Sequence, residues 1–217
     1  MKNVLKKIST FPLYGAFIVP LDQGAQWKHI QFDKIPANNV SFSKSLILKV
    51  DKSSSFLVFP LETEKEVESF EIKGKYSGGL NLPEGKEQGY GKADDFAFKF
   101  GFILPGEEKL TGVKKWLAPK WVKKVYEMAP KDQGLNHLEL FAATTQDKML
   151  GKKRIHPASD FFHEEYSFLL KDSGEFSFEK KINGSLRTLA LWLSADGDNS
   201  KSSFSIEVTS LKVHFKE

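Results

Sequence analysis

Carboxylate and amide side chains cluster in a short polar segment near the C-terminus. The segment "SADGDNSK" places Asp196, Asp198 and Asn199 between two apolar, alternating stretches. Calcium takes about six to eight oxygen ligands, and Asp94 or Asp95 could supply more of them if the two segments meet. Asp, Gly and Asn are also preferred turn formers for backbone reasons alone. The segment therefore predicts a hairpin connection first. The alternative is a structural calcium site at Asp196, Asp198, Asn199 and Asp95.

Flat aromatic side chains are the second feature with chemical meaning. Sugars are bound when an aromatic face packs on a C–H-rich ring face, with polar groups around it. Trp192 alternates with leucines, so it lies either in the core or on a concave sheet. Trp116 and Trp121 either form exposed platforms or anchor a loop, and burial is favoured because large aromatic side chains are mostly covered. The candidate ligand-binding residues are Trp116, Trp121, Trp192 and Tyr90.

Catalytic residues cannot be assigned from the sequence. Asp94 and Asp95 point to opposite sides of an extended chain, so they cannot act as one acid–base pair. A glycoside hydrolase needs two carboxylates about 5–9 Å apart, facing one substrate. The histidines lack HExxH or HxH spacing, and no glycine-rich phosphate loop follows a strand. The sequence therefore favours a protein that is not an enzyme.

The elements that must position these residues are mostly strands. Phe96, Phe98, Phe100 and Phe102 alternate with smaller or polar residues, so they share one strand face that a second layer must cover. A bulge is expected near Thr209–Ser210, where the alternation changes phase. Further strands are expected in 55–61, 135–145, 186–195 and 203–215 and on both sides of a turn at 36–39.

Two segments break the alternation. Residues 119–130 predict a short helix with proline at its first turn. Residues 159–170 predict one or two helical turns that begin at Ser159 or Asp160. Together the pattern predicts an all-β, antiparallel two-sheet β-sandwich of jelly-roll type, with one or two short helices in loops.

Three segments carry a resemblance to a known family. They are "ADDFAFKFGFIL" (93–104), "DFFHEEYSFLL" (160–170) and "LALWLSADGDNSKSSFSIEVTSLKV" (189–213). In this order they resemble a family of uncharacterised bacterial proteins with a galactose-binding-like β-jelly-roll fold, over roughly 120 residues. The resemblance implies a sandwich related to carbohydrate-binding modules, which often carry a structural calcium. It implies no enzymatic activity.

Composition and charge limit the remaining possibilities. The 217 residues include 32 basic and 28 acidic side chains, which is not a nucleic-acid-binding composition. There is no cysteine, so disulfides and thiolate chemistry are excluded. No apolar run approaches the roughly 18 residues of a membrane span. Residues 1–26 predict an N-terminal arm or an export signal, and 27–217 predict a single β-sandwich domain. The export alternative favours a periplasmic or secreted protein, and the other a cytoplasmic one.

These observations lead to one leading function and two alternatives. The leading function is a non-catalytic binding module for a carbohydrate or glycan. One alternative is a polysaccharide-active hydrolase or lyase that uses a carboxylate pair. The other is a protein- or membrane-interaction domain that uses the basic amphipathic segment 113–128.

Overall fold

The computed structural model describes residues 15–130, 133–157 and 159–216, and strands dominate them. The strands are β1 (Phe17–Ile18), β2 (Lys28–Gln31), β3 (Asn39–Phe42), β4 (Leu46–Asp51), β5 (Ser54–Gly79), β6 (Lys99–Gly106), β7 (Gly134–Thr144), β8 (Lys153–Ile155), β9 (Phe162–Leu169), β10 (Gly174–Lys181), β11 (Arg187–Asp196) and β12 (Ser203–Phe215). The helices are α1 (Gly112–Leu117) and α2 (Lys120–Tyr126), and short 3₁₀ turns cover 24–26, 91–93 and 147–149. The expected all-β class with short helices in loops is confirmed.

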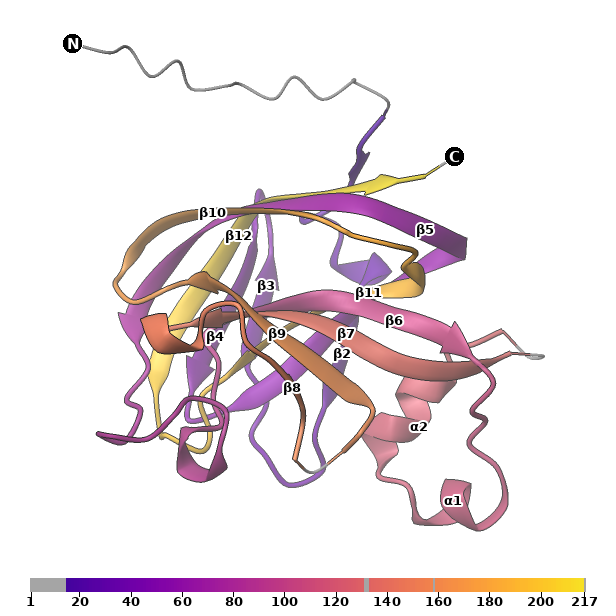
Figure 1. Ribbon diagram of the computed structural model, residues 1–217, viewed down its shortest axis with the longest axis horizontal. Helices are drawn as coiled ribbons and strands as arrows, with labels where there is room; N and C mark the ends of the chain where they lie inside the picture. The colour runs from indigo at the N-terminus through magenta and orange to yellow at the C-terminus, as the bar shows by residue number, and fades with distance from the viewer. Residues whose placement is uncertain (1–14, 131–132, 158, 217) are drawn as a thin grey trace.

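Two layers of sheet share one long strand, β5 (Figure 1). Its residues 54–66 pair with β2 and β11, and its residues 67–79 pair with β10 and β12. Layer A contains β3, β4, β12, β1, β10 and the second part of β5. Layer B contains β2, the first part of β5, β11, β6, β7, β9 and β8. The pairing of β9 with β7 is parallel and the other described pairings are antiparallel, so the sandwich is mixed.

A local irregularity lets β5 pass from one layer to the other. Ala190 of β11 pairs with Pro60, whereas Thr188 pairs with Lys65. Residues 61–64 of β5 therefore lie opposite Leu189 alone. Extra residues on one strand of a pair bend that strand and increase its twist. The bend carries the second half of β5 over the interior (Figure 1).

Phenylalanines from both layers seal the interior. Phe98, Phe100 and Phe102, in and just before β6, are fully buried in the main core. The ring of Phe70, from β5, lies 4.9 Å from that of Phe100 and 5.6 Å from that of Phe102. Full burial of each such side chain contributes about 1.5–3 kcal/mol. The predicted phenylalanine-rich interior is confirmed, except that Phe96 is buried in a separate small cluster.

The outer face of layer B carries a second apolar cluster, which α2 covers. Trp192 and Phe56 stack with 3.7 Å between ring centroids. Trp121 and Val125 of α2 pack in the same cluster. The helix begins directly after Pro119, as the sequence predicts. Because successive side chains of a strand face opposite sides, the strands that fill the interior also build this outer cluster.

Three local predictions are wrong. Residues 159–170 are not helical, because 162–169 form strand β9. The segment 196–202 is not a hairpin turn, because β11 lies in layer B and β12 in layer A. The strand expected directly before the turn at 36–39 does not form: residues 32–35 are irregular, and β3 begins at Asn39. The predicted bulge is confirmed as a register shift between Val208 and Ser210.

The N-terminal segment is described in part. Residues 1–14 of the predicted arm or export signal lie outside the described residues. The rest of that segment supplies β1, which pairs with the end of β12. None of the helices in the described part of the chain has the length and apolar character needed to cross a membrane.

Candidate functional site

A cavity of about 300 Å³ lies on the outer face of layer B, beside α2. Strands β5, β6, β7, β9 and β11 contribute to its floor through the side chains of their outer face. We call it the aromatic–acidic pocket. Its apolar wall consists of Phe32, Ile35, Trp121, Leu140, Phe162 and Trp192. Its polar wall includes Asp94, Lys99, His156, Glu164, Asp196, Asp198 and Asn199.

The apolar wall is built from aromatic rings in mutual contact. Trp121 lies with its ring centroid 5.5 Å from Phe32 and 5.9 Å from Phe162. Phe162 lies 5.9 Å from Trp192. The indole N–H of Trp192 donates a hydrogen bond of 3.1 Å to Ser194 Oγ, which satisfies the polar atom of a buried ring. Two tryptophans far apart in the sequence thus border one cavity.

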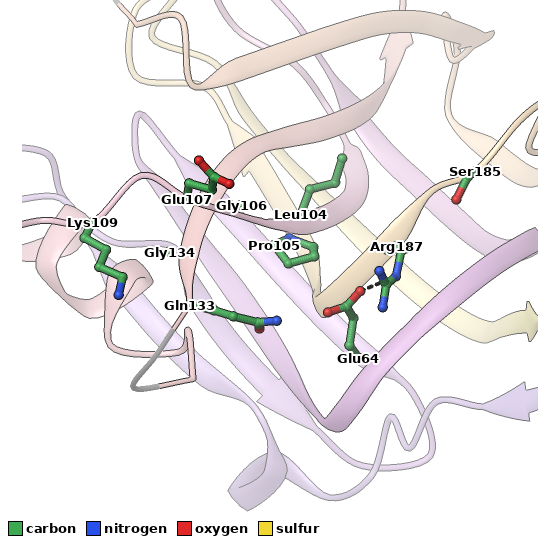
Figure 2. A pocket seen from close by; sticks show the side chains of 10 residues that line it. All are labelled: Glu64, Leu104, Pro105, Gly106, Glu107, Lys109, Gln133, Gly134, Ser185 and Arg187. Carbon is green, nitrogen blue, oxygen red and sulfur yellow. Dashed lines mark ion pairs between the residues drawn. The ribbon is translucent and has the colours of Figure 1, made fainter.

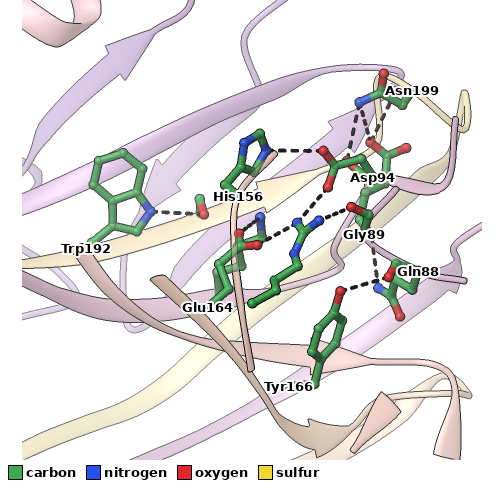
Figure 3. A network of polar contacts seen from close by, with 12 residues as sticks. Gln88, Gly89, Asp94, His156, Glu164, Tyr166, Trp192 and Asn199 are labelled. Atoms are coloured by element: carbon green, nitrogen blue, oxygen red, sulfur yellow. Dashed lines mark hydrogen bonds and ion pairs between the residues drawn. The ribbon is translucent and has the colours of Figure 1, made fainter. Parts of the chain in front are cut away.

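The polar wall contains a network of charged side chains centred on Glu164 (Figure 3). Lys99 Nζ lies 2.6 Å from Glu164 Oε1, and Arg154 Nη2 lies 2.5 Å from Glu164 Oε2. Arg154 Nη2 also lies 2.8 Å from Asp94 Oδ1. His156 Nε2 is 3.2 Å from the other oxygen of Asp94. Two carboxylates are therefore matched by two cations and a histidine.

The cations keep both carboxylates ionised. Burial alone would raise the pKa of Asp94, but His156, Lys99 and Arg154 outweigh it and lower the pKa to about 2. Burial also opposes ionisation of Glu164, and Lys99 and Arg154 again lower its pKa below the usual range. Neither carboxyl can therefore act as a proton donor near neutral pH.

The loop before β6 holds this network in place. Arg154 donates to the carbonyl of Gly89, and Tyr166 Oη donates to the carbonyl of Gln88 at 2.8 Å. Gln88 Nε2 donates to the carbonyl of Asp95 at 2.9 Å. Gly89 has φ 98°, and a side chain there would overlap Tyr166 and Arg154. Glycine is thus required where backbone and side chains approach this closely.

Asp95 anchors the segment that crosses between the layers. Its side chain is fully buried and accepts hydrogen bonds from the backbone N–H of Asn199 (3.2 Å) and of Ser200 (2.5 Å). The side-chain amide of Asn199 donates to the carbonyl of Asp94 at 3.3 Å. The two acidic segments, 94–95 and 196–199, therefore meet, which the calcium hypothesis requires.

The pKa of the Asp196 carboxyl is shifted in the opposite direction from those of Asp94 and Glu164. Burial raises its pKa well above the usual range, and the neighbouring carboxyls of Asp198 and Asp95 raise it further, against the influence of Lys99. Oxygen atoms of these three acids lie within 4.8 Å of one another. Asp196 Oδ1 is buried without a hydrogen-bond partner. Carboxyls this close either share a proton or hold a divalent cation, and an all-oxygen donor set suits calcium. The calcium site remains a prediction.

The predicted ligand-binding residues divide into two groups. Trp121 and Trp192 line the pocket. Trp116 lies on α1 with 79% of its surface exposed, so the expectation of burial is wrong for it. Tyr90 is 50% exposed and lies outside the lining, with its ring 5.4 Å from the guanidinium of Arg154. The structure therefore brings two of the four candidates together with the predicted calcium ligands.

The sequence interpretation missed the charged network. Lys99 alternates with phenylalanines, which predicts only that it lies on the opposite face of the strand. Glu164 falls within 159–170, where the sequence predicts helical turns and the structure has strand β9. A signal did exist: Phe162, Glu164 and Tyr166 alternate with His163 and Glu165, a period of two. A buried glutamate breaks the apolar pattern of such a strand, and its partners come from distant segments.

A second, larger hollow lies at the far end of β6 (Figure 2). It measures about 630 Å³ and is bordered by residues 104–107 and by the ion pair of Arg187 with Glu64. Two of its charged groups, Glu64 and Arg187, pair with each other, and its lining contains no aromatic side chain. We therefore place the candidate site in the aromatic–acidic pocket.

The fold and the pocket define an all-β sandwich protein with a small cavity lined by aromatic and acidic side chains. No family model and no curated protein matches the chain. The resemblance to an uncharacterised bacterial family with a galactose-binding-like jelly roll therefore remains a prediction.

Several solved structures overlap with the chain at low similarity. One is a low-affinity xylan-binding module, CBM86, from Roseburia intestinalis, with 10% identity, a TM-score of 0.31 and coverage of 88% of this chain and 96% of that one. A chain from the crystal structure of reduced XRCC1 bound to the DNA polymerase β catalytic domain gives 10% identity, a TM-score of 0.34, and coverage of 88% of this chain and 100% of that one. A CocE/NonD family hydrolase from Staphylococcus aureus gives 9% identity and a TM-score of 0.31, with coverage of 96% of this chain and 38% of that one. TM-scores below 0.5 do not establish a common fold, so the function has to be inferred from the pocket itself.

Proposed function

We propose that the protein is a non-catalytic module that binds a carbohydrate in the aromatic–acidic pocket. One observation carries the proposal: Trp121 of α2 and Trp192 of β11 border a single cavity whose other wall is rich in carboxylates. Aromatic faces pack against the C–H-rich faces of sugar rings, and a few placed polar groups orient the ligand. Ionised Asp94 and Glu164 are hydrogen-bond acceptors for hydroxyl groups.

The size of the pocket limits the ligand. Small-molecule pockets measure on the order of 300–1,000 Å³, and a cavity of about 300 Å³ lies at the small end of that range. It accommodates a single sugar residue or the end of an oligosaccharide. We therefore propose recognition of a chain end or a side branch.

A glycan array followed by calorimetric titration of the best ligand tests this proposal. Trp121→Ala should weaken binding at least tenfold, because it removes one aromatic wall. Trp116→Ala is the matched control, since this tryptophan lies on the neighbouring helix and is 79% exposed outside the pocket. Absence of glycan binding by the unmodified protein, or equal losses in both variants, would contradict the proposal.

Hydrolysis of a polysaccharide is the second candidate, and the raised pKa of Asp196 favours it. A general acid must hold its proton near the working pH. Asp196, Asp198 and Asp95 lie too close together to flank a glycosidic bond, which needs carboxyls about 5–9 Å apart. The acid would therefore need an ionised partner elsewhere in the polar wall, such as Glu164. If the protein releases reducing ends from a panel of polysaccharides and Asp196→Asn abolishes that activity, hydrolysis replaces binding as the proposed function.

Attachment to an anionic surface through α1 is the third candidate. Val113, Trp116 and Leu117 are 70%, 79% and 67% exposed, and Lys114 and Lys115 are exposed beside them. Exposed apolar side chains flanked by lysines suit the surface of an anionic membrane. Co-sedimentation with phosphatidylserine vesicles at low and high salt tests it, and equal recovery in the supernatant with and without vesicles would contradict it.

A further inference from the structure

Two histidines and a glutamate gather on the face of layer B that the carbohydrate proposal does not use. His137 and Glu139 are two residues apart on β7, so they point to the same side. The parallel pairing places His163 of β9 beside Glu139. Phe141, the next residue on that side of β7, belongs to the core between the layers. The three side chains therefore lie on the inner face of layer B, at a position where each is half-buried.

Their donor atoms are close enough to share one ion. One nitrogen of each imidazole and a carboxylate oxygen all lie within 4.8 Å of one another. His137 Nε2 lies 3.5 Å from Glu139 Oε2, and the rings of His137 and His163 stack with 3.9 Å between centroids. On a tetrahedral zinc ion with bonds of about 2.0–2.1 Å, neighbouring ligand atoms are about 3.3 Å apart. His137 Nε2 and Glu139 Oε2, 3.5 Å apart, are already close to that spacing.

We propose that His137, Glu139 and His163 bind a divalent transition-metal ion, with Zn²⁺ the ion that this donor set suits best. Two imidazoles and one carboxylate are borderline donors that favour zinc over calcium or magnesium. A cavity of about 380 Å³, bordered by Glu139, His163 and residues 153–155, lies beside the cluster. Three protein ligands beside a cavity leave a fourth position for water or an exogenous ligand.

The environment of His163 agrees with a metal ligand. Burial and the neighbouring imidazole of His137 lower its pKa, and together they outweigh Glu139 and Asp160, which act to raise it. The neutral imidazole, which is the form that binds a metal, is therefore favoured near neutral pH. The carboxylate of Glu139 supplies the negative charge that partly compensates the ion.

The chain offers a matched control within itself. His214 Nε2 lies 3.3 Å from Glu71 Oε1, so this pair repeats the histidine–carboxylate contact of His137 and Glu139. The two histidine side chains also have similar exposure, 25% and 18%. No second histidine joins the His214 pair in the described part of the chain. A difference in metal binding between the His137–Glu139 pair and the His214–Glu71 pair therefore reports on the third donor, His163.

Calorimetric titration of the untagged, chelator-treated full chain with ZnCl₂ tests the proposal. We expect one ion per chain. His163→Ala and His137→Ala should each weaken binding at least about 100-fold, since even outer-shell changes cost 10–100-fold. His214→Ala should bind as tightly as the unmodified protein. Co²⁺ should give visible absorption bands that are absent in His163→Ala. The chain contains no cysteine, so no thiolate competes for the ion.

Three results would overturn the proposal: no saturable binding, binding unaffected by His163→Ala, or binding abolished by Asp198→Asn while His163→Ala retains it. The last outcome would assign the ion to the acidic cluster of the pocket. If a histidine variant melts at a lower temperature than the unmodified protein, Glu139→Gln takes its place, because it preserves the shape of the side chain and removes the anionic donor.

Discussion

Replacing Glu164 by Gln should strongly destabilise the fold near neutral pH. Glu164 is 2% exposed, and Lys99, 2.6 Å away, is 9% exposed. After the change Arg154 still has Asp94, and Lys99 keeps the face of the Phe96 ring at 3.9 Å but loses its anion. Removing one partner of a buried ion pair costs about 3–5 kcal/mol. At roughly 2–4 °C per kcal/mol for a chain of this size, Tm should fall by about 6–20 °C.

Urea unfolding and thermal melts at pH 7 measure this effect against two controls. Glu108→Gln removes an exposed partner of Lys114, 3.9 Å away, and should cost less than about 1 kcal/mol. The double variant Lys99→Met/Glu164→Leu should recover most of the loss, because apolar residues of similar volume replace a buried pair at little cost. If Glu164→Gln costs no more than Glu108→Gln, the view that this network organises the pocket is refuted.

Three further predictions concern acid stability, calcium and the core. The pKa of Asp94 is lowered from 3.8 to about 2, so its ionised form contributes about 2 kcal/mol above pH 4, and this is lost as pH falls from 4 toward 2. The stability difference between the unmodified protein and Asp94→Asn should therefore be present at pH 6 and shrink at pH 3 in urea titrations. Millimolar Ca²⁺ should raise Tm, and Asp198→Asn should abolish the rise; an unchanged Tm on adding the ion would reject the calcium site. Phe70→Ala, which removes a ring in contact with Phe100 and Phe102, should cost about 3–5 kcal/mol by denaturant unfolding, whereas Trp116→Ala should stay within about 0.5 kcal/mol.

Alternation of side chains was enough to predict the layered fold. Phe98, Phe100 and Phe102 repeat every second residue, and a pattern of that kind depends on the residues of the strand alone. The phase change at Val208–Ser210 likewise appears in the sequence because a bulge shifts the register locally. The helix after Pro119 is also a local signal.

The site could be predicted less well, because it depends on pairing between distant segments. Asp95 and Asn199 meet because β6 and β11 are neighbours. The residue types alone predict a shared site only on the condition that the two segments meet. The contacts of Glu164 could not be predicted because its partners, Lys99 and Arg154, stand on other strands. Which strands are neighbours is decided by the whole sheet, and composition does not report it.

The double role of β5 makes the two layers mutually dependent. A single run of 26 residues supplies a strand to each sheet, so neither sheet retains all its strands without the other. Many of its contacts join residues far apart in sequence. In such topologies the chain loses loop-closure entropy before the stabilising contacts form. We therefore expect slow, all-or-none folding, in which the aromatic–acidic pocket on one face of layer B and the histidine cluster on its opposite face are lost together.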